Sequence, residues 1–179
     1  MAERKPRRLD AEGLWLYALR SLGGRAQSVG ELRDKLVRRA AEPAGVPGIL
    51  DRLKERGYLD DRQYAESYSA SRLENQGFGR ARVLRDLRAR RVAPALAEQA
   101  VAEAYRGSDE LRLIEDYLRR KYRSRPLETW LLEPKNLASA YRRLRTAGFT
   151  AGNSIRVLKR FASEPEVLDA LEGEEELPG

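Results

Sequence analysis

The chain has 179 residues, of which 35 are Lys or Arg and 28 are Asp or Glu, so its formal net charge is +7. It contains no Cys and no His. This excludes disulfides, thiolate nucleophiles and Cys-ligated metals, and it removes the side chain most often used as a general base or metal ligand. We find no apolar run near the length that spans a bilayer and no apolar signal segment after the basic N-terminus, so we expect a cytoplasmic protein with no membrane partner.

The positive charge is unevenly distributed along the chain. From Glu164 onward there are seven acidic residues and no Lys or Arg, so the +7 of the whole chain and the −7 of this segment leave +14 on residues 1–163. Such a charge favours a polyanionic partner, and nucleic acid is the commonest polyanion. The alternative interpretation is a solvated surface rich in Arg. The acidic tail, residues 164–179, raises a further hypothesis, in which it competes with the polyanion for the basic residues.

A first group of three helices is predicted over residues 10–59, after a basic tail at residues 1–9. The first helix ends at Gly23 and Gly24, because paired glycines break a helix. A capping box formed by Ser28 and Glu31 begins the second helix. The apolar residues expected in the buried stripe of the first helix are Trp15, Leu19 and Leu22, flanked by Leu14 and Ala18.

A second group of three helices is predicted over residues 60–107. Asp60 and Asp61 stand where an N-cap is expected, and Gln63 completes a capping box with Asp60. A glycine-containing loop follows the first helix and leads into a basic helix from Arg80 to Arg91, and the third helix begins near Pro94. The residues expected to be buried in the first helix are Tyr64, Ala65 and Tyr68.

A third group of three helices is predicted over residues 108–163. A longer connection, residues 124–134, separates its first helix from its second and contains Pro126 and Trp130. The three groups align without gaps over their last two helices when Leu36, Leu87 and Leu144 are set level, and the positions 13, 14 and 17 residues further on are then apolar in all three. We find no sustained alternation typical of strands. The predicted fold is all-α, with three tandem three-helix, helix-turn-helix-like repeats in an elongated, curved array.

Two patterns are candidate active sites, and neither supports catalysis. Gly77-Phe78-Gly79 is a fragment of a phosphate-binding loop, but it follows a helix and Arg82 stands where a third glycine would be. The adjacent carboxylates of Asp60 and Asp61 are typical of a helix cap. The sequence therefore predicts no catalytic residues, no cofactor and no metal, and hence a protein that is not an enzyme.

The basic helices are the strongest functional signal. The second helix of each repeat offers several basic residues, and stacked repeats could align them into one positive track. Arg suits this role because its planar guanidinium can hold a phosphate or carboxylate bidentately. The competing interpretation is that each helix is simply amphipathic with a charged outer face. The candidate binding residues are Lys35, Arg38, Arg39, Arg80, Arg82, Arg85, Arg88, Arg91, Arg142, Arg143 and Arg145.

A second basic cluster ends the first helix of the third repeat. Some of its charge favours the negative end of that helix, and the remainder extends into the long connection, where it could contact a partner. Aromatic residues do not alternate with basic ones in the sequence as stacking platforms would, so most of the tyrosines are predicted to be core residues. The cluster consists of Arg119, Arg120, Lys121, Arg123 and Arg125.

Three motifs and one further residue of this sequence occur together in a known family. They are Ser28-x-x-Glu31-Leu32-x-x-Lys35-Leu36, Leu53-x-x-x-Gly57-Tyr58-Leu59-Asp60-Asp61-x-x-Tyr64-Ala65, Arg72, and Gly77-x-Gly79-x-x-Arg82-Val83-x-x-Asp86-Leu87-x-x-Arg90-x-Val92. Through them the sequence between Leu14 and Phe161 resembles the bacterial regulatory protein RecX family, most strongly from Gly57 to Val92. One departure is Arg91, at a position where the family pattern has Gly.

The resemblance implies a non-enzymatic regulator that binds the filament of the RecA recombinase on single-stranded DNA, suppresses strand exchange and ATP turnover, and limits the DNA-damage response. We expect a monomer whose partners are this filament and single-stranded DNA, with duplex DNA as a further possible ligand. Two alternatives stay open: a helix-turn-helix-like transcription regulator that binds DNA, and a scaffold that binds only protein.

Overall fold

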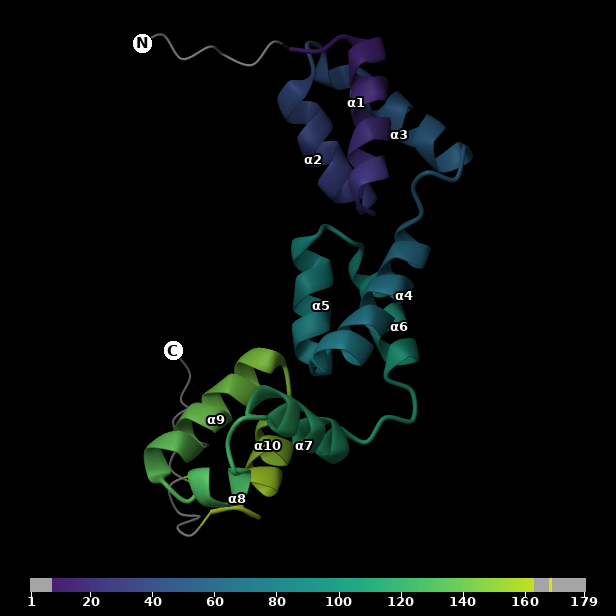
Figure 1. Ribbon diagram of the computed structural model, residues 1–179. Coiled ribbons are helices and arrows are strands. Elements are labelled where there is room, and N and C mark those ends of the chain that lie inside the picture. Colours follow the sequence, from purple (N-terminus) through teal and green to yellow (C-terminus); the bar gives the residue numbers. More distant parts are fainter. Residues whose placement is uncertain (1–7, 163–167, 169–179) are drawn as a thin grey trace, which may run out of the picture. The chain divides into compact units, whose positions relative to one another are not determined.

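The computed structural model describes residues 8–162 and Leu168, and within this part the secondary structure is helical apart from one isolated bridge between Leu9 and Ala40 (Figure 1). The prediction of an all-α fold is confirmed. Most of the predicted basic tail, residues 1–7, and nearly all of the acidic tail lie outside the described residues.

The first three helices pack together around one apolar core. They are α1 (Ala11–Gly24), α2 (Val29–Arg39) and α3 (Val46–Glu55), with a 3-10 turn, η1 (Pro43–Gly45), before α3. The predicted capping box is present: the Ser28 hydroxyl accepts from the Glu31 amide at 3.0 Å, and the Glu31 carboxylate accepts from the Ser28 amide at 3.4 Å. The buried stripe of α1 is Leu14 and Ala18, whereas Trp15, Leu19 and Leu22 are only partly buried at its edge.

The next helices are α4 (Asp61–Ser71), α5 (Arg80–Ala89) and α6 (Pro94–Ala104), with a π-helical turn, η2 (Arg72–Gln76), extending α4. Asp60 caps α4 as predicted, since its carboxylate accepts from the Gln63 amide at 3.0 Å. Asp61 does not, because its carboxylate accepts instead from the Val29 amide at 2.8 Å, in the first turn of α2. The chain turns out of α4 through Gly77, whose φ of 61° is readily adopted only by glycine.

The last helices are α7 (Glu110–Lys121), α9 (Pro134–Ala147) and α10 (Ala151–Leu158), and a short helix, α8 (Leu127–Trp130), lies in the long connection between α7 and α9. Their core includes Ile114, Leu118, Tyr141 and Leu144, and Leu168 is buried in the same core. α10 packs against both α7 and α9.

The described chain divides into two compact parts whose boundary runs through α4, α5 and α6. The N-terminal body contains residues 8–68 and 86–100, and the C-terminal body contains residues 69–85, 101–162 and Leu168. The second predicted repeat is therefore shared between them. The repeat boundaries at residues 10–59, 60–107 and 108–163 remain a prediction from the sequence.

Within the N-terminal body, the first turn of α2 rests on the end of α5. The hydroxyl of Ser28 donates to the carbonyl of Arg90, and the guanidinium of Arg90 donates to the Glu31 carboxylate at 3.3 Å. Burial raises the pKa of Asp61, although the hydrogen bond from the Val29 amide acts in the opposite direction. We call this contact, formed by the first turn of α2 with Asp61, Arg90 and Arg91, the first joint.

The C-terminal body contains a contact of the same design, which we call the second joint. Here the first turn of α5 rests on the end of α9: the Gly79 amide donates to the Ala147 carbonyl at 2.8 Å, and the Ala81 amide donates to the Gly148 carbonyl at 3.2 Å. In the alignment that sets Leu87 level with Leu144, Arg90 corresponds to Ala147 and Arg91 to Gly148. Both joints therefore use the same positions of the repeat.

Both joints have glycine at the point of closest approach, but at different positions of the repeat. The second joint has two such glycines. A Cβ on Gly79 would collide with the Gly148 carbonyl oxygen, and a Cβ on Gly148, in the left-handed turn with φ of 91°, would lie 2.6 Å from the Cβ of Arg82. At the first joint the equivalent turn residue is Arg91, which adopts φ of 62° despite its side chain. The glycine there is Gly30 of α2, where a Cβ would lie 2.9 Å from the Arg91 carbonyl oxygen and closer still to the Arg91 Cβ. The departure from the family pattern at Arg91 is thus accommodated by Gly30.

We expect Gly30→Ala to lower the free energy of unfolding by about 1–3 kcal/mol, because the added methyl overpacks the first joint. Arg91→Gly should be close to neutral or stabilising, since it removes a left-handed residue that costs about 1–2 kcal/mol and gives up only an exposed ion pair to Asp34. The double variant should recover part of the Gly30→Ala loss. Urea unfolding of the four proteins measures this coupling.

The matched control is Gly23→Ala in α1, because a Cβ there meets nothing within 4 Å. This substitution should leave stability unchanged or raise it by up to about 1 kcal/mol, as expected for Gly to Ala in a helix. Strictly additive effects of Gly30→Ala and Arg91→Gly would contradict the proposed complementarity of the two positions.

Candidate nucleic-acid interface

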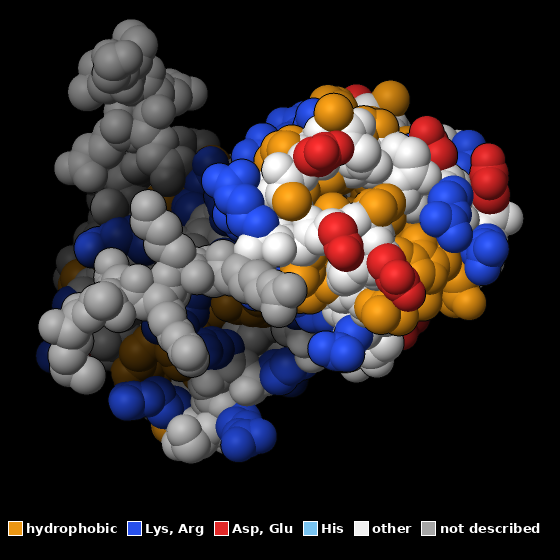
Figure 2. Space-filling model, turned by 90° about the horizontal axis from the view of Figure 1, so that it is seen from above, with side chains coloured by type: hydrophobic (Ala, Val, Ile, Leu, Met, Phe, Trp, Pro, Cys, Tyr) orange, Lys and Arg blue, Asp and Glu red, His pale blue; other side chains and the backbone are white. Residues whose placement is uncertain are grey.

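Two of the three basic candidates of the first repeat, Lys35 and Arg39, make contacts within the N-terminal body. The ammonium of Lys35 donates to the side-chain oxygen of buried Gln27 and to the Ser21 hydroxyl at 3.5 Å, so it holds the connection between α1 and α2. The guanidinium of Arg39 lies 4.5 Å from the ring centre of Tyr17, and Arg38 is exposed. Figure 2, which views the α1–α3 end of the N-terminal body, shows acidic, basic and apolar side chains mixed on that face.

The basic candidates at the end of α5 are paired with acids in the N-terminal body. Arg88 forms an ion pair with Glu98 at 2.9 Å, and Arg91 forms one with Asp34 at 3.5 Å. Both pairs are exposed, so each contributes little to stability but offsets the local positive charge. The first joint therefore does not present an excess of free guanidinium groups.

The repeat alignment explains the difference between the joints. The positions of Glu31 and Asp34 in α2 correspond to those of Arg82 and Arg85 in α5. At the first joint the carboxylate of Glu31 accepts from Arg90 at 3.3 Å and from Arg25 at 3.2 Å. The same positions are thus acidic at the first joint and basic at the second, and the basic edge is not repeated evenly along the chain.

At the second joint, arginines from two helices converge around one hollow of about 350 Å³. Arg82 comes from α5, and Arg142 and Arg143 come from α9. The guanidinium groups of Arg82 and Arg85 both donate to the carbonyl of Thr146, at 3.5 and 3.2 Å. This carbonyl belongs to the last turn of α9, where the helix dipole is negative and favours cations. We use the name basic groove for this hollow together with Arg82, Arg142 and Arg143, which line it, and Arg85, which shares the Thr146 carbonyl with Arg82.

Aromatic side chains form part of the wall of the basic groove. Phe78 lies beneath Arg82, with 5.3 Å between the guanidinium carbon and the ring centre, and Tyr117 lines the hollow from α7. Burial raises the pKa of Tyr117, an effect that the charge of Arg143 opposes. Within the described residues no carboxylate pairs with Arg142 or Arg143, so these two exposed guanidinium groups can bind an external anion.

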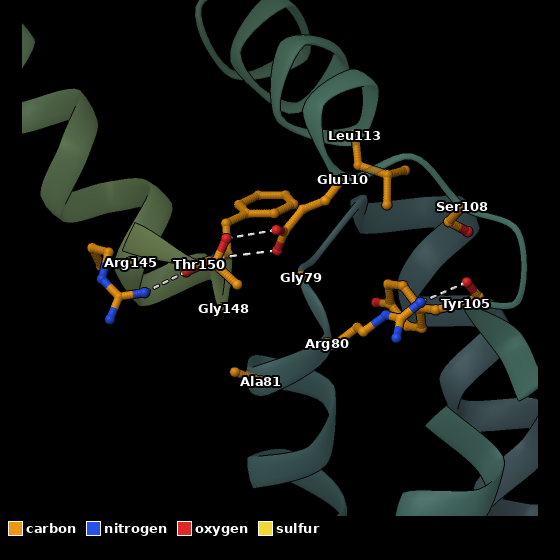
Figure 3. A pocket seen from close by; sticks show the side chains of 11 residues that line it. Gly79, Arg80, Ala81, Tyr105, Ser108, Glu110, Leu113, Arg145, Gly148 and Thr150 are labelled. Atoms are coloured by element: carbon orange, nitrogen blue, oxygen red, sulfur yellow. Dashed lines mark hydrogen bonds between the residues drawn. The ribbon is translucent and has the colours of Figure 1, made fainter. Parts of the chain in front are cut away.

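The remaining two candidates, Arg80 and Arg145, face a different cavity of about 340 Å³ in the C-terminal body (Figure 3). Arg80 donates to the Tyr105 carbonyl at 2.8 Å, and Arg145 donates to the Phe149 carbonyl. Glu110 in this cavity accepts from the Thr150 amide and hydroxyl, at 3.1 and 2.6 Å. Burial alone would raise the pKa of Glu110, but these hydrogen bonds and one from Asn153 outweigh it and lower the pKa. The charged side chains of Arg80, Arg145 and Glu110 are therefore all hydrogen-bonded within the C-terminal body.

The described part of the chain offers neither a metal centre nor a membrane span. No group of three or more Asp or Glu side chains lies close enough together there to hold a metal ion. None of the helices in that part is both long and apolar enough to cross a bilayer.

Comparison with known proteins identifies the family. A family model for the second three-helix domain of RecX matches residues 60–101, which cover α4, α5 and most of α6. The regulatory protein RecX of Deinococcus radiodurans is 35% identical over 153 residues, covering 83% of this chain and 70% of the relative. The chain belongs to the RecX family. The RecX of Trichlorobacter lovleyi is also similar, with 34% identity over 108 residues that cover 60% of this chain and 70% of that protein.

Solved RecX structures share the fold. The crystal structure of RecX from Lactobacillus salivarius matches with a TM-score of 0.58 and 18% identity, covering 84% of this chain and 95% of that one. A second RecX crystal structure matches with a TM-score of 0.59 and 20% identity, covering 83% of this chain and 73% of the other. RecX relatives are named for a regulatory role and not for a reaction, in agreement with the prediction that this chain is not an enzyme.

The structure also reveals contacts that the sequence pattern did not indicate. Arg125 lies over Trp130 with 5.3 Å between the guanidinium carbon and the ring centre. Trp130 packs against Tyr122 with 4.5 Å between ring centres and 38° between ring planes, so basic and aromatic residues do gather in the third repeat. The spacing of Arg125 and Trp130 around Pro126 is the signal that could have found them, because a proline turn folds neighbouring residues back toward one another.

We expect the double variant Arg142→Glu with Arg143→Glu to weaken binding of single-stranded DNA by one to two orders of magnitude, because it reverses both guanidinium charges of α9 in the basic groove. The slope of log K against log salt should fall by about 1.4, as expected when two phosphates of a single strand are no longer neutralised. Fluorescence anisotropy with a labelled oligonucleotide measures both quantities.

The control for this measurement is Arg112→Glu with Arg156→Glu, which makes the same change in net charge on α7 and α10. Both residues are exposed and neither lines the basic groove. If the two double variants weaken binding equally, the effect is one of overall charge and the basic groove is not the binding site.

Proposed function

We propose that this RecX-family protein binds the filament that the RecA recombinase forms on single-stranded DNA, inhibits its recombinase and ATPase activities, and so limits recombination and the DNA-damage response in the cytoplasm. The proposal rests first on membership of a family of regulatory proteins. The structural observation that supports it is the convergence of Arg82, Arg142 and Arg143 on one hollow of the C-terminal body.

The basic groove suits a phosphate backbone for two reasons. Arg82 and Arg85 are oriented by the Thr146 carbonyl, so part of the entropy cost of ordering these long side chains is already met in the free protein. Arg142 and Arg143 stand on consecutive positions of α9 and line the same hollow, which lets them reach neighbouring phosphates of one strand. Binding through such contacts weakens as salt increases.

The N-terminal body suits contact with protein better than contact with DNA. Its first joint places acids where the second joint has arginines, and its ion pairs offset Arg88 and Arg91. It also carries three of the four exposed large apolar side chains in the described part of the chain. These are Leu16, Val37 and Tyr58. We infer that this body contacts the recombinase while the basic groove contacts the DNA strand.

Inhibition follows from simultaneous contact with both components of the filament. A protein that joins neighbouring recombinase protomers and the strand restrains the conformational changes of the filament that accompany ATP turnover. The strength of this restraint is set by how much more tightly the protein binds the restrained conformation than the others. Two linked contacts also raise the effective concentration of each for the other. The protein should therefore bind the assembled filament more tightly than either free DNA or free recombinase, and it should do so as a monomer.

The test is a titration of the DNA-dependent ATPase activity of the RecA recombinase with this protein. We expect inhibition at amounts well below one protein per nucleotide of single-stranded DNA, and weaker inhibition as salt is raised. A sequence-specific footprint on duplex DNA, together with unchanged ATPase activity, would instead support a transcription regulator and contradict the proposal.

A further inference from the structure

The basic residues at the end of α7 lie in two different environments. Arg120 donates to the carbonyl of Asn75 at 3.0 Å, so it is used inside the C-terminal body. Arg119, Arg123 and Arg125 instead line a hollow of about 340 Å³. The acid that shares this lining is Glu128, and the lining charge is therefore positive. Within the described part of the chain, no ion pair is formed by Arg119, Arg123 or Arg125.

The position of Arg125 is fixed by stacking. Its guanidinium lies 5.3 Å from the centre of Trp130, and Trp130 lies 4.5 Å from Tyr122. A guanidinium that stacks on an aromatic face leaves its N–H groups pointing outward from its edge. Such an arginine is ready to bind a phosphate, and the aromatic contact restricts its motion beforehand.

The hydroxyl of Tyr122 is the independent observation that points to a ligand. Tyr122 lines the hollow, yet its hydroxyl oxygen is buried and has no hydrogen-bond partner in the described part of the chain. A buried hydroxyl without a partner is unfavourable, and native structures rarely keep one without a reason. Because this oxygen is buried in the free protein, side chains at the rim of the hollow must move aside before a phosphate oxygen that enters between the arginines can accept its hydrogen bond.

Part of the lining of the hollow is apolar and aromatic. Phe161, just beyond α10, belongs to this part and is only partly buried. A partly accessible ring beside a group of arginines is an arrangement by which proteins bind single-stranded nucleic acid, with a base stacked on the ring and phosphates on the guanidinium groups. A free phosphate would not use this apolar lining.

We propose that this hollow is a nucleotide-binding subsite for single-stranded nucleic acid, in which Arg119, Arg123 and Arg125 bind the backbone, the Tyr122 hydroxyl donates to a phosphate oxygen and Phe161 stacks on a base. It deepens the proposed function, on which it rests, by adding a second DNA contact in the C-terminal body. The basic groove binds the backbone between α5 and α9, whereas this subsite uses α7, the turn before α8 and Phe161 just beyond α10.

The experiment measures anisotropy of two labelled oligonucleotides, an oligo-dT and an abasic backbone of equal length, with the full chain and no recombinase. Arg123→Ala with Arg125→Ala should weaken binding of both probes by about tenfold and lower the salt slope by about 1.4. Phe161→Leu should weaken oligo-dT binding by about tenfold and leave the abasic probe unchanged, because base stacking is removed while the apolar lining is kept.

Tyr122→Phe gives a readout that a purely structural role would not produce. It removes an unsatisfied buried hydroxyl, so the thermal midpoint of the free protein should stay level or rise, while the affinity for both probes should fall severalfold. The control is Arg112→Ala with Arg156→Ala, an equal reduction of charge outside the hollow.

The proposal is overturned if Arg123→Ala with Arg125→Ala binds the probes as the control does, or if Phe161→Leu affects both probes equally. A third pair of results would also overturn it. In that case oligo-dT binding strengthens greatly when four acidic residues are changed to Gln, whereas the subsite variants leave oligo-dT binding unchanged. The four residues are Glu172, Glu174, Glu175 and Glu176. Because no recombinase is present, these results are independent of ATPase inhibition. Inhibition that survives in the subsite variants would leave the proposed function standing while this subsite is rejected.

Discussion

This structure depends on one close contact, which occurs in both joints. The N-terminus of a helix approaches the left-handed turn that ends the equivalent helix of the next repeat. The approach leaves no room for a Cβ at its tightest points. Gly79 and Gly148 occupy these points at the second joint and Gly30 occupies one at the first, where Arg91 adopts the left-handed conformation at a cost in backbone energy. Once this contact is formed, the hydrogen bonds from Ser28 and from the Gly79 amide to the opposing carbonyls set the register of the repeats.

The same geometry carries opposite electrostatics at its two occurrences. Glu31 and Asp34 at the first joint pair with arginines of the N-terminal body, whereas Arg82 and Arg85 at the equivalent positions turn toward a backbone carbonyl and join Arg142 and Arg143. The same packing of helix on helix therefore occurs once as a contact with paired charges and once as the basic groove that we propose binds the DNA strand. The proposed location of function thus rests on charge and not on the fold.

Local signals in the sequence are sufficient to predict part of this structure. The capping boxes at Ser28 and Asp60 and the helical class of every segment depend on nearby residues, and the helical class and both N-caps are confirmed. The actual partner of Asp61, the inward turn of Lys35 and the separation of Arg80 and Arg145 from the basic groove depend on the tertiary packing around them. Helical periodicity places a side chain on a face, but it does not say which carbonyl or carboxylate will meet it.

The most direct test of this account is to transfer the charges of the first joint to the second, with Arg82→Glu and Arg85→Asp, and to measure inhibition of the recombinase ATPase activity on single-stranded DNA. The substitutions leave Gly148 and the backbone contacts of the joint in place. The account predicts a folded protein, verified by circular dichroism, whose inhibition requires at least about tenfold more protein, because two phosphate-binding guanidinium groups are replaced by carboxylates that repel the strand. Inhibition equal to that of the unmodified protein would contradict the account.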